Sequence, residues 1–130
     1  MNKIVLEVRR TAHTAVRLPF ERLAGRILPA QYRLSVVLCG DALSKRLNRE
    51  YRQKTYTPNV LSFPLSKTEG EIFINVHVAA REARHYGVPV KARIAHLFVH
   101  GCAHLRGLPH GARMDALEAR TLRAEGFRYW

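Results

Sequence analysis

Three histidines within one short segment form the pattern in this sequence that is best suited to chemistry. They are His100, His104 and His110, in the spacing H-x3-H-x5-H. Residues four apart lie on the same face of an α-helix, so the first two can present their imidazoles to one ion. Gly107 can end that helix in a left-handed conformation and Pro109 prevents its continuation, which allows the third histidine to return towards the same ion.

Three neutral imidazoles suit zinc, with Zn–N distances of about 2.0–2.1 Å and a fourth tetrahedral position left for water. We therefore expect one zinc ion per chain, held by the three histidines, although nickel, cobalt or iron also accept such ligands. Cys102 lies roughly 200° around the helix from His100, so it points away from the ion. Burying three polar rings without a common partner is unfavourable, which argues against three unrelated core histidines.

His96 lies one helical turn before His100, on the same face. A single ion is not easily reached from three successive turns, which span about 11 Å along the helix axis. We therefore predict that His96 supports the site or packs in the core. For His13, His77 and His85 we expect ordinary surface or core positions.

The site lacks the base of a zinc peptidase. In the H-E-x-x-H motif the glutamate after the first histidine is the general base, and here that position is Gly101. An ion with three neutral ligands keeps its full charge, which suits an anionic phosphodiester and can activate water near neutral pH. Such a site requires a nearby arginine to stabilise charge in the transition state.

The charge of the chain favours a polyanionic partner. There are 22 Lys and Arg against 10 Asp and Glu, a net charge of +12 on 130 residues. Most of the basic residues are arginines, which can hold phosphate through two parallel hydrogen bonds. A solvated basic surface would give the same total, so charge alone leaves both interpretations open.

Hydrophobic periodicity predicts one α+β domain over residues 1–130, in which a small mixed sheet of about four strands packs with about five helices. Asp41 and Asn75 are suitable helix N-caps, and Leu43, Leu47 and Tyr51 form one stripe of the helix after Asp41. The helix that starts at Pro89 is apolar all round, so it must be buried, and the metal site lies at its end. The expected strands cover 4–9, 32–38, 60–63 and 71–74, and the expected helices cover 20–28, 41–51, 75–86, 89–106 and about 113–125.

Cysteine usage and the N-terminus indicate a cytoplasmic protein with no membrane partner. Cys39 and Cys102 form no CxxC pair, which favours a reducing compartment. The apolar stretch near the N-terminus is short and interrupted by Glu7, unlike a signal sequence or a membrane span.

Four segments resemble the YbeY family of bacterial endoribonucleases that mature ribosomal RNA. They are NREYRQK at 48–54, NVLSFP at 59–64, GEIFIN at 70–75 and the histidine block at 96–110. The resemblance implies zinc at the three histidines and identifies Arg52 with the essential arginine of the family. It also implies single-strand-specific cleavage at the 3′ end of small-subunit ribosomal RNA, ribosome quality control, and the small subunit and its associated proteins as partners.

The sequence departs from the family at several positions. The family usually has Gly-Tyr-Asp-His where this chain has Gly107-Leu108-Pro109-His110, so the carboxylate beside the third ligand is absent. Thr57-Pro58 replaces the common Pro-Thr, and Glu71 replaces an aspartate. We expect these changes to affect rate and substrate choice more than metal binding.

Three further residues are candidates for substrate binding: Lys54, Ser62 and Arg106, of which Arg106 is chosen from its position in the metal loop alone. Each can also be an ordinary surface or capping residue. The leading hypothesis is a zinc-dependent endoribonuclease. The alternative is a non-catalytic ribosome-assembly or RNA-binding factor with a structural zinc site, and a hydrolase of peptides or small molecules is disfavoured by Gly101 and the positive charge.

Overall fold

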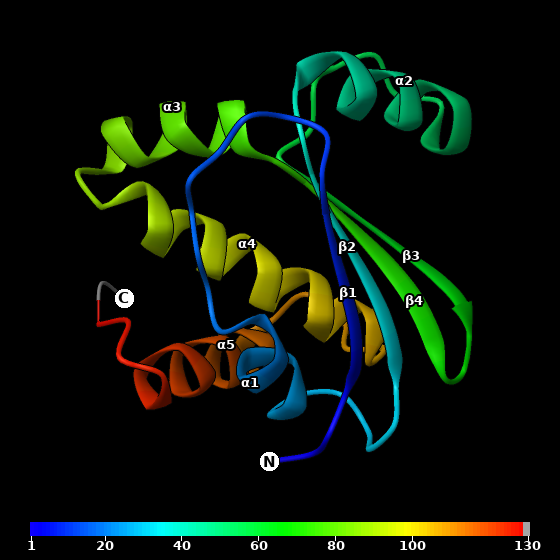
Figure 1. Cartoon of the computed structure of the whole chain (residues 1–130), viewed down its shortest axis with the longest axis vertical. Helices are drawn as coiled ribbons and strands as arrows, with labels where there is room; N and C mark the ends of the chain where they lie inside the picture. The colour runs from blue at the N-terminus through cyan, green and yellow to red at the C-terminus, as the bar shows by residue number, and fades with distance from the viewer. Residues whose placement is uncertain (129–130) are drawn as a thin grey trace.

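The computed structural model describes residues 1–128, and within them the predicted α+β class is confirmed (Figure 1). Residues 129 and 130 of the predicted 1–130 domain lie outside the described part. A four-stranded mixed sheet is combined with five helices in this range. The elements are β1 (Val5–Arg10), α1 (Phe20–Gly25), β2 (Arg33–Cys39), α2 (Asp41–Arg52), β3 (Val60–Ser66), β4 (Glu69–Asn75), α3 (Val76–Tyr86), α4 (Val90–Leu105) and α5 (Ala112–Ala124).

The strand order of the sheet is β1-β2-β4-β3. β2 pairs in parallel with β1 and β4, whereas β3 runs antiparallel to β4 at the edge. Alternate residues share a face, and one face of β2 and β4 is fully buried. Its buried side chains are Leu34, Val36, Leu38, Ile72 and Ile74.

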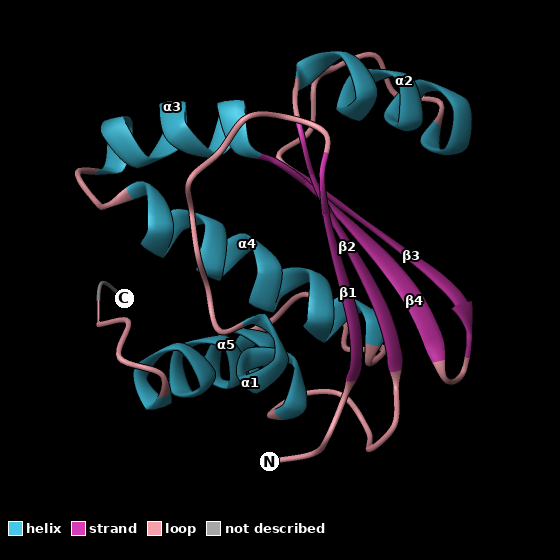
Figure 2. Ribbon diagram, viewed as in Figure 1, coloured by secondary structure: helices cyan, strands magenta, loops and turns pink. Residues whose placement is uncertain are grey.

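This buried face packs against a layer of helices. Figure 2 shows α1, α3, α4 and α5 on that side of the sheet, with α2 at one end on the other side. α4 runs through the middle of the layer and contacts α1, α3, α5 and both strands of the β3–β4 hairpin. Phe98 on α4 is wholly buried and meets Phe20 edge-on, with ring centroids 4.9 Å apart. The predicted central buried helix is therefore confirmed.

Asn75 and Gly87 bound α3 as the sequence predicts. The side chain of Asn75 accepts hydrogen bonds from the backbone N–H groups of His77 and Val78, at 3.0 and 3.1 Å. Gly87 follows the last turn with φ +69°, a left-handed conformation that glycine adopts easily.

The β3–β4 hairpin is longer than predicted. The strands reach Ser66 and begin again at Glu69, so most of the expected connection over 64–70 is strand. Pro64 is tolerated inside β3 because β3 is an edge strand, where a missing N–H need not break the ladder. The pairing shifts register between Pro64 and Ser66.

The first helix is shorter than predicted, ending at Gly25 rather than at residue 28. The carbonyl of Gly25 would normally accept from residue 29, but Pro29 has no N–H. The backbone N–H of Asn2 donates to that carbonyl instead, at 2.8 Å. Ile27 and Leu28 nevertheless remain buried in the turn that follows.

Tyr51 on α2 is largely exposed, whereas Leu43 and Leu47 of its predicted stripe are half-buried. Tyr51 is 63% exposed, and its ring rests edge-on against Phe63 of the edge strand β3, which leaves much of it in solvent. The buried residues of α2 are instead the polar Ser44 and Asn48. Among residues 1–128, no helix is both long and apolar enough to cross a membrane.

Candidate metal centre

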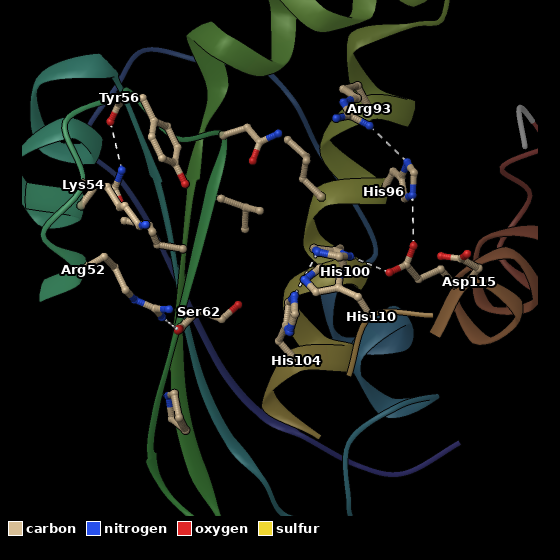
Figure 3. A pocket seen from close by; sticks show the side chains of 17 residues that line it. Arg52, Lys54, Tyr56, Ser62, Arg93, His96, His100, His104, His110 and Asp115 are labelled. Carbon is tan, nitrogen blue, oxygen red and sulfur yellow. Dashed lines mark hydrogen bonds and ion pairs between the residues drawn. The ribbon is translucent and has the colours of Figure 1, made fainter. Parts of the chain in front are cut away.

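The three histidines predicted as ligands meet at the C-terminal end of α4 (Figure 3). His100 and His104 lie one turn apart, and their Nε2 atoms are 3.0 Å from each other. His110 comes from the loop before α5. One ligand atom from each of the three rings lies within 4.8 Å of the other two.

The reversal after α4 brings His110 to the site. Gly107 has φ +93°, and its N–H donates to the carbonyl of His104 at 2.9 Å. The N–H of Leu108 donates to the carbonyl of Ala103 at 3.1 Å, which closes the helix end. The left-handed conformation predicted for Gly107 is therefore present.

The donor set fits a divalent metal ion. A tetrahedral zinc ion holds its ligand nitrogens about 3.3 Å apart, close to the separation of His100 and His104 in this structure. Burial lowers the pKa of His104, and the neighbouring His100 and His110 lower it further. A lowered pKa favours the neutral imidazole, which is the form that binds metal. Cys102 is buried in the core, and so is Cys39, as the sequence indicates.

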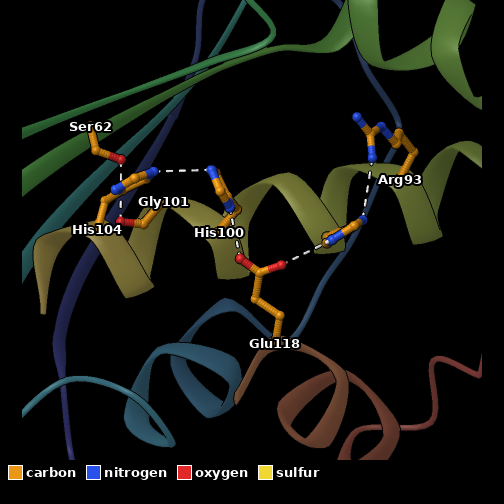
Figure 4. Close-up of polar contacts among 7 residues, drawn as sticks. Ser62, Arg93, His100, Gly101, His104 and Glu118 are labelled. Carbon is orange, nitrogen blue, oxygen red and sulfur yellow. Dashed lines mark hydrogen bonds and ion pairs between the residues drawn. The ribbon is translucent and has the colours of Figure 1, made fainter. Parts of the chain in front are cut away.

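A buried carboxylate that the sequence analysis missed supports the cluster. Glu118 on α5 has a side chain only 8% exposed, and it lies between two histidines of α4 (Figure 4). Its Oε2 is 2.7 Å from His100 Nδ1, and its Oε1 is 3.2 Å from His96 Nε2. Burial alone would raise the pKa of Glu118, but the hydrogen bonds and charges of the two histidines outweigh it and lower the pKa to about 2.

The ionised Glu118 fixes the orientation of His100. A carboxylate can only accept, so the Nδ1–H of His100 donates to it and the lone pair of Nε2 is directed towards His104. The sequence does carry a signal for this residue. Glu118 falls on the inward stripe of α5 beside Met114 and Leu117, where an unpaired charge would be unfavourable.

His96 supports the site and is not part of the three-histidine cluster. Besides Glu118, its ring contacts Arg93, whose Nη1 lies 3.2 Å from His96 Nδ1. Arg93 Nε in turn donates to Glu82 at 3.0 Å. A chain of polar contacts therefore runs along α4 from His100 to α3.

Arg52 lies on the opposite wall of the site. Its Nη2 donates to the carbonyl of Ser62 at 2.6 Å, and its guanidinium carbon is 5.2 Å from the centroid of the Phe63 ring. Arg52 also helps to lower the pKa of His104, so its charge acts at the histidine cluster. The guanidinium is thus held in place by β3.

The space beside the first histidine excludes a peptidase glutamate. Gly101 faces β3 and β4, and a Cβ there would lie 2.9 Å from Ser62 Oγ and 3.1 Å from the side chain of Ile72. The hydroxyl of Ser62 donates to the carbonyl of Gly101 at 3.2 Å. A larger residue at this position would therefore have to push aside the hydroxyl of Ser62 and the side chain of Ile72.

One pocket of about 750 Å³ joins these groups. Arg52, Lys54 and Ser62 line it together with the three histidines. Arg106 is not brought into this lining, since it is the exposed residue that follows α4. Asp115 and Glu118 of α5 place carboxylates on the wall of this pocket. The carboxylate that the family usually has directly before the third histidine is absent here, because that position is Pro109.

Comparison with known proteins gives consistent matches over most of the chain. A family model described as Endoribonuclease YbeY matches residues 3–128. A protein named Endoribonuclease YbeY from Aromatoleum aromaticum is 39% identical over 97% of this chain and 91% of its own length. Another of that name, from Bordetella petrii, is 43% identical over 72% of this chain and 66% of its own length.

The fold is also found in a solved structure. The solution structure of TM1509 from Thermotoga maritima matches with a TM-score of 0.67 and 18% sequence identity. The match covers 91% of this chain and 87% of that protein. At this identity, the similarity shows a shared fold.

Proposed function

The chain belongs to the YbeY family of endoribonucleases, and on this premise we propose that it is a zinc-dependent endoribonuclease that hydrolyses single-stranded RNA. The observation that carries the proposal is that the histidine cluster and Arg52 line the same pocket. Hydrolysis of a phosphodiester requires both an activated water and positive charge beside the phosphate. We assign this activity to one domain over residues 1–130.

His100, His104 and His110 are the residues that would hold the ion, one per chain. When bound, zinc acts as a Lewis acid that lowers the pKa of water and polarises a phosphoryl oxygen. Glu118 holds the proton at Nδ1 of His100, so this ring has one orientation available for ligation. The lowered pKa of His104 supports ligation at neutral pH.

Arg52 would bind the scissile phosphate and stabilise the charge that develops on it. A guanidinium has five N–H donors, so the bond to the Ser62 carbonyl leaves donors for phosphate oxygens. Because that bond and the Phe63 ring already hold Arg52, little ordering is required when the substrate binds. Lys54 lines the same wall and adds a second positive charge.

The shape and charge of the molecule support an unpaired strand as the substrate. A pocket of about 750 Å³ is in the range that encloses a drug-sized ligand, which suits one or two unpaired nucleotides. The net charge of +12 attracts the phosphate backbone over the surrounding surface.

We further propose that the physiological substrate is the 3′ end of small-subunit ribosomal RNA, with a role in ribosome quality control in the cytoplasm. Family membership supports this proposal. Two buried cysteines without a disulfide are compatible with a reducing compartment.

The proposal is tested with one labelled oligoribonucleotide, offered single-stranded and as a duplex with its complement. We expect the zinc-loaded protein to cleave the single strand and to leave the duplex intact. Cleavage should stop in the presence of a chelator and resume when zinc is added back. Cleavage that continues in excess chelator would contradict the metal site. Tight, salt-sensitive binding without cleavage would favour the ribosome-assembly factor.

A further inference from the structure

The loop between α2 and β3 is held firmly against α2. The hydroxyl of Ser44 donates to the carbonyl of Pro58 at 2.8 Å, and the amide of Asn48 donates to the carbonyl of Tyr56 at 3.0 Å. The carbonyl of Asn48 accepts from the backbone N–H of Lys54 at 3.2 Å. Two residues of one helix therefore fix three points of this loop.

These anchors are buried. Ser44 is 2% exposed and Asn48 is 1% exposed, so if the loop left α2 their polar groups would lose partners away from water. A buried polar group without a partner destabilises the structure, because it gives up its hydrogen bonds to water and receives none in return. The side chains that α2 buries thus serve to order the loop, which explains why polar residues occupy those positions.

The ordered loop presents an aromatic ring to the pocket. Tyr56 is 62% exposed, yet it lines the same pocket as the histidine cluster, and its ring points into that space from the wall opposite α4 (Figure 3). Arg52 and Lys54 line this wall beside it. Positive charges next to an open aromatic ring are the combination that binds unpaired nucleic acid, through phosphate contacts and base stacking.

We propose that Tyr56 is a base-stacking residue, which receives the base of a nucleotide next to the scissile phosphate while Arg52 and Lys54 bind the backbone. This inference rests on the proposed function and assigns a substrate subsite to it. It also gives a physical reason for a preference for single strands. A base in a duplex is already paired and stacked on its neighbours, so its face is not available to the ring.

Tyr51 provides a matched control. It is 63% exposed and lies five residues earlier, but it is not among the residues that line the pocket, and its ring packs against Phe63. If RNA bound nonspecifically to any exposed aromatic side chain, replacing either tyrosine would weaken binding equally. If the subsite exists, only Tyr56 matters.

The test measures binding of a fluorescein-labelled single-stranded oligoribonucleotide to the zinc-loaded protein by stopped-flow anisotropy, at fixed salt and before cleavage begins. We expect Tyr56→Ala to bind about 5- to 150-fold more weakly than the parent, the range of one lost base–aromatic stack. Tyr56→Phe and Tyr51→Ala should bind like the parent. Thermal unfolding of each variant checks that the fold is retained.

A second strand series tests stacking itself. One abasic nucleotide is moved along the oligoribonucleotide, and at one position we expect it to weaken binding to the parent but not to Tyr56→Ala, because both changes remove the same contact. The proposal would be overturned if Tyr56→Ala bound RNA as tightly as the parent, or if Tyr56→Phe lost as much affinity as Tyr56→Ala. It would also be overturned if the losses from the abasic nucleotide and from Tyr56→Ala were additive at every position. So would the lack of measurable binding by the parent.

The outcomes separate this inference from the proposed function. A strand that binds through Tyr56 but is never cleaved refutes the hydrolase and retains the stacking subsite. Cleavage that proceeds with unchanged KM in Tyr56→Ala retains the hydrolase and refutes the subsite.

Discussion

Replacing Glu118 by alanine should weaken metal binding although Glu118 is not one of the three histidine ligands. The change removes the carboxylate that accepts from His100 Nδ1 at 2.7 Å. Without it, the ring of His100 can rotate and can place its proton on either nitrogen, so the arrangement that binds metal is less populated. We expect zinc affinity to fall about 10- to 100-fold.

The structure supports this magnitude independently. A hydrogen bond to a charged group contributes about 1.5–3 kcal/mol, and a 2.7 Å contact lies at the short end of such bonds. The Glu118 side chain is 8% exposed, so water does not readily take its place. At about 1.4 kcal/mol per factor of ten, this range corresponds to roughly 10- to 150-fold, which is an upper bound because the metal-free protein also makes the bond. Glu118→Gln keeps an acceptor but loses the charge, so its effect should be smaller.

The assay is competition for zinc between the protein and a chromophoric chelator. His96→Ala is the control, because it removes the other partner of Glu118 and leaves the bond to His100. It should reduce affinity less than Glu118→Ala does. If Glu118→Ala unfolds at the same temperature as the parent and binds zinc equally well, Glu118 does not orient His100 for the metal. An equal loss of affinity in His96→Ala would lead to the same conclusion.

Three further predictions concern the contact between α4 and the sheet, and an ion pair that joins α1 to the end of α5 away from the site. Gly101→Ala should lower the free energy of unfolding, because crowding in the core costs about 1–3 kcal/mol. The higher helix propensity of alanine offsets only roughly 1 kcal/mol of this cost. Urea unfolding measures the difference. Ser62→Ala removes one hydroxyl bond to α4 but leaves the carbonyl that holds Arg52, so it should reduce stability by about 0.5–1.5 kcal/mol and retain RNA cleavage. The pKa of Glu125 is lowered mainly by the hydrogen bond that it accepts from Arg22. The ionised Glu125 therefore stabilises the fold at pH values above the ordinary glutamate pKa, and this stability is lost as the pH falls through the lowered pKa. In thermal melts at pH 2–7, Glu125→Gln should make the decline in melting temperature towards acid pH less steep.

Each of these predictions has an opposite outcome that is easily recognised. Greater stability of Gly101→Ala would mean that α4 has room beside the sheet. Lost cleavage in Ser62→Ala, with the fold intact, would place its hydroxyl on the substrate. An unchanged acid profile in Glu125→Gln would show that this carboxylate does not contribute to acid unfolding.

The sequence predicted the parts of the site that depend on neighbours along the chain. The spacing of His100 and His104 follows from helix geometry, and Gly107 and Pro109 account for the reversal that returns His110. These are local effects, which a single segment contains.

Glu118 could not be assigned in the same way. It approaches His100 from a different helix, and only the packing of α5 on α4 brings the two together. Tyr51 shares a helical stripe with Leu43 and Leu47, but its exposure depends on its contact with Phe63 of the edge strand β3, which periodicity along α2 does not contain. The roles of Ser44 and Asn48 likewise depend on the path of the following loop.

The most direct test of the central claim measures metal content and RNA cleavage on the same preparations of the parent, Arg52→Ala, His100→Ala and the control Arg106→Ala. We expect about one zinc per chain and cleavage in the parent and in Arg106→Ala, zinc without cleavage in Arg52→Ala, and loss of both in His100→Ala. Full cleavage by zinc-free His100→Ala, or by Arg52→Ala, would contradict the assignment of the histidine cluster and Arg52 as the catalytic site.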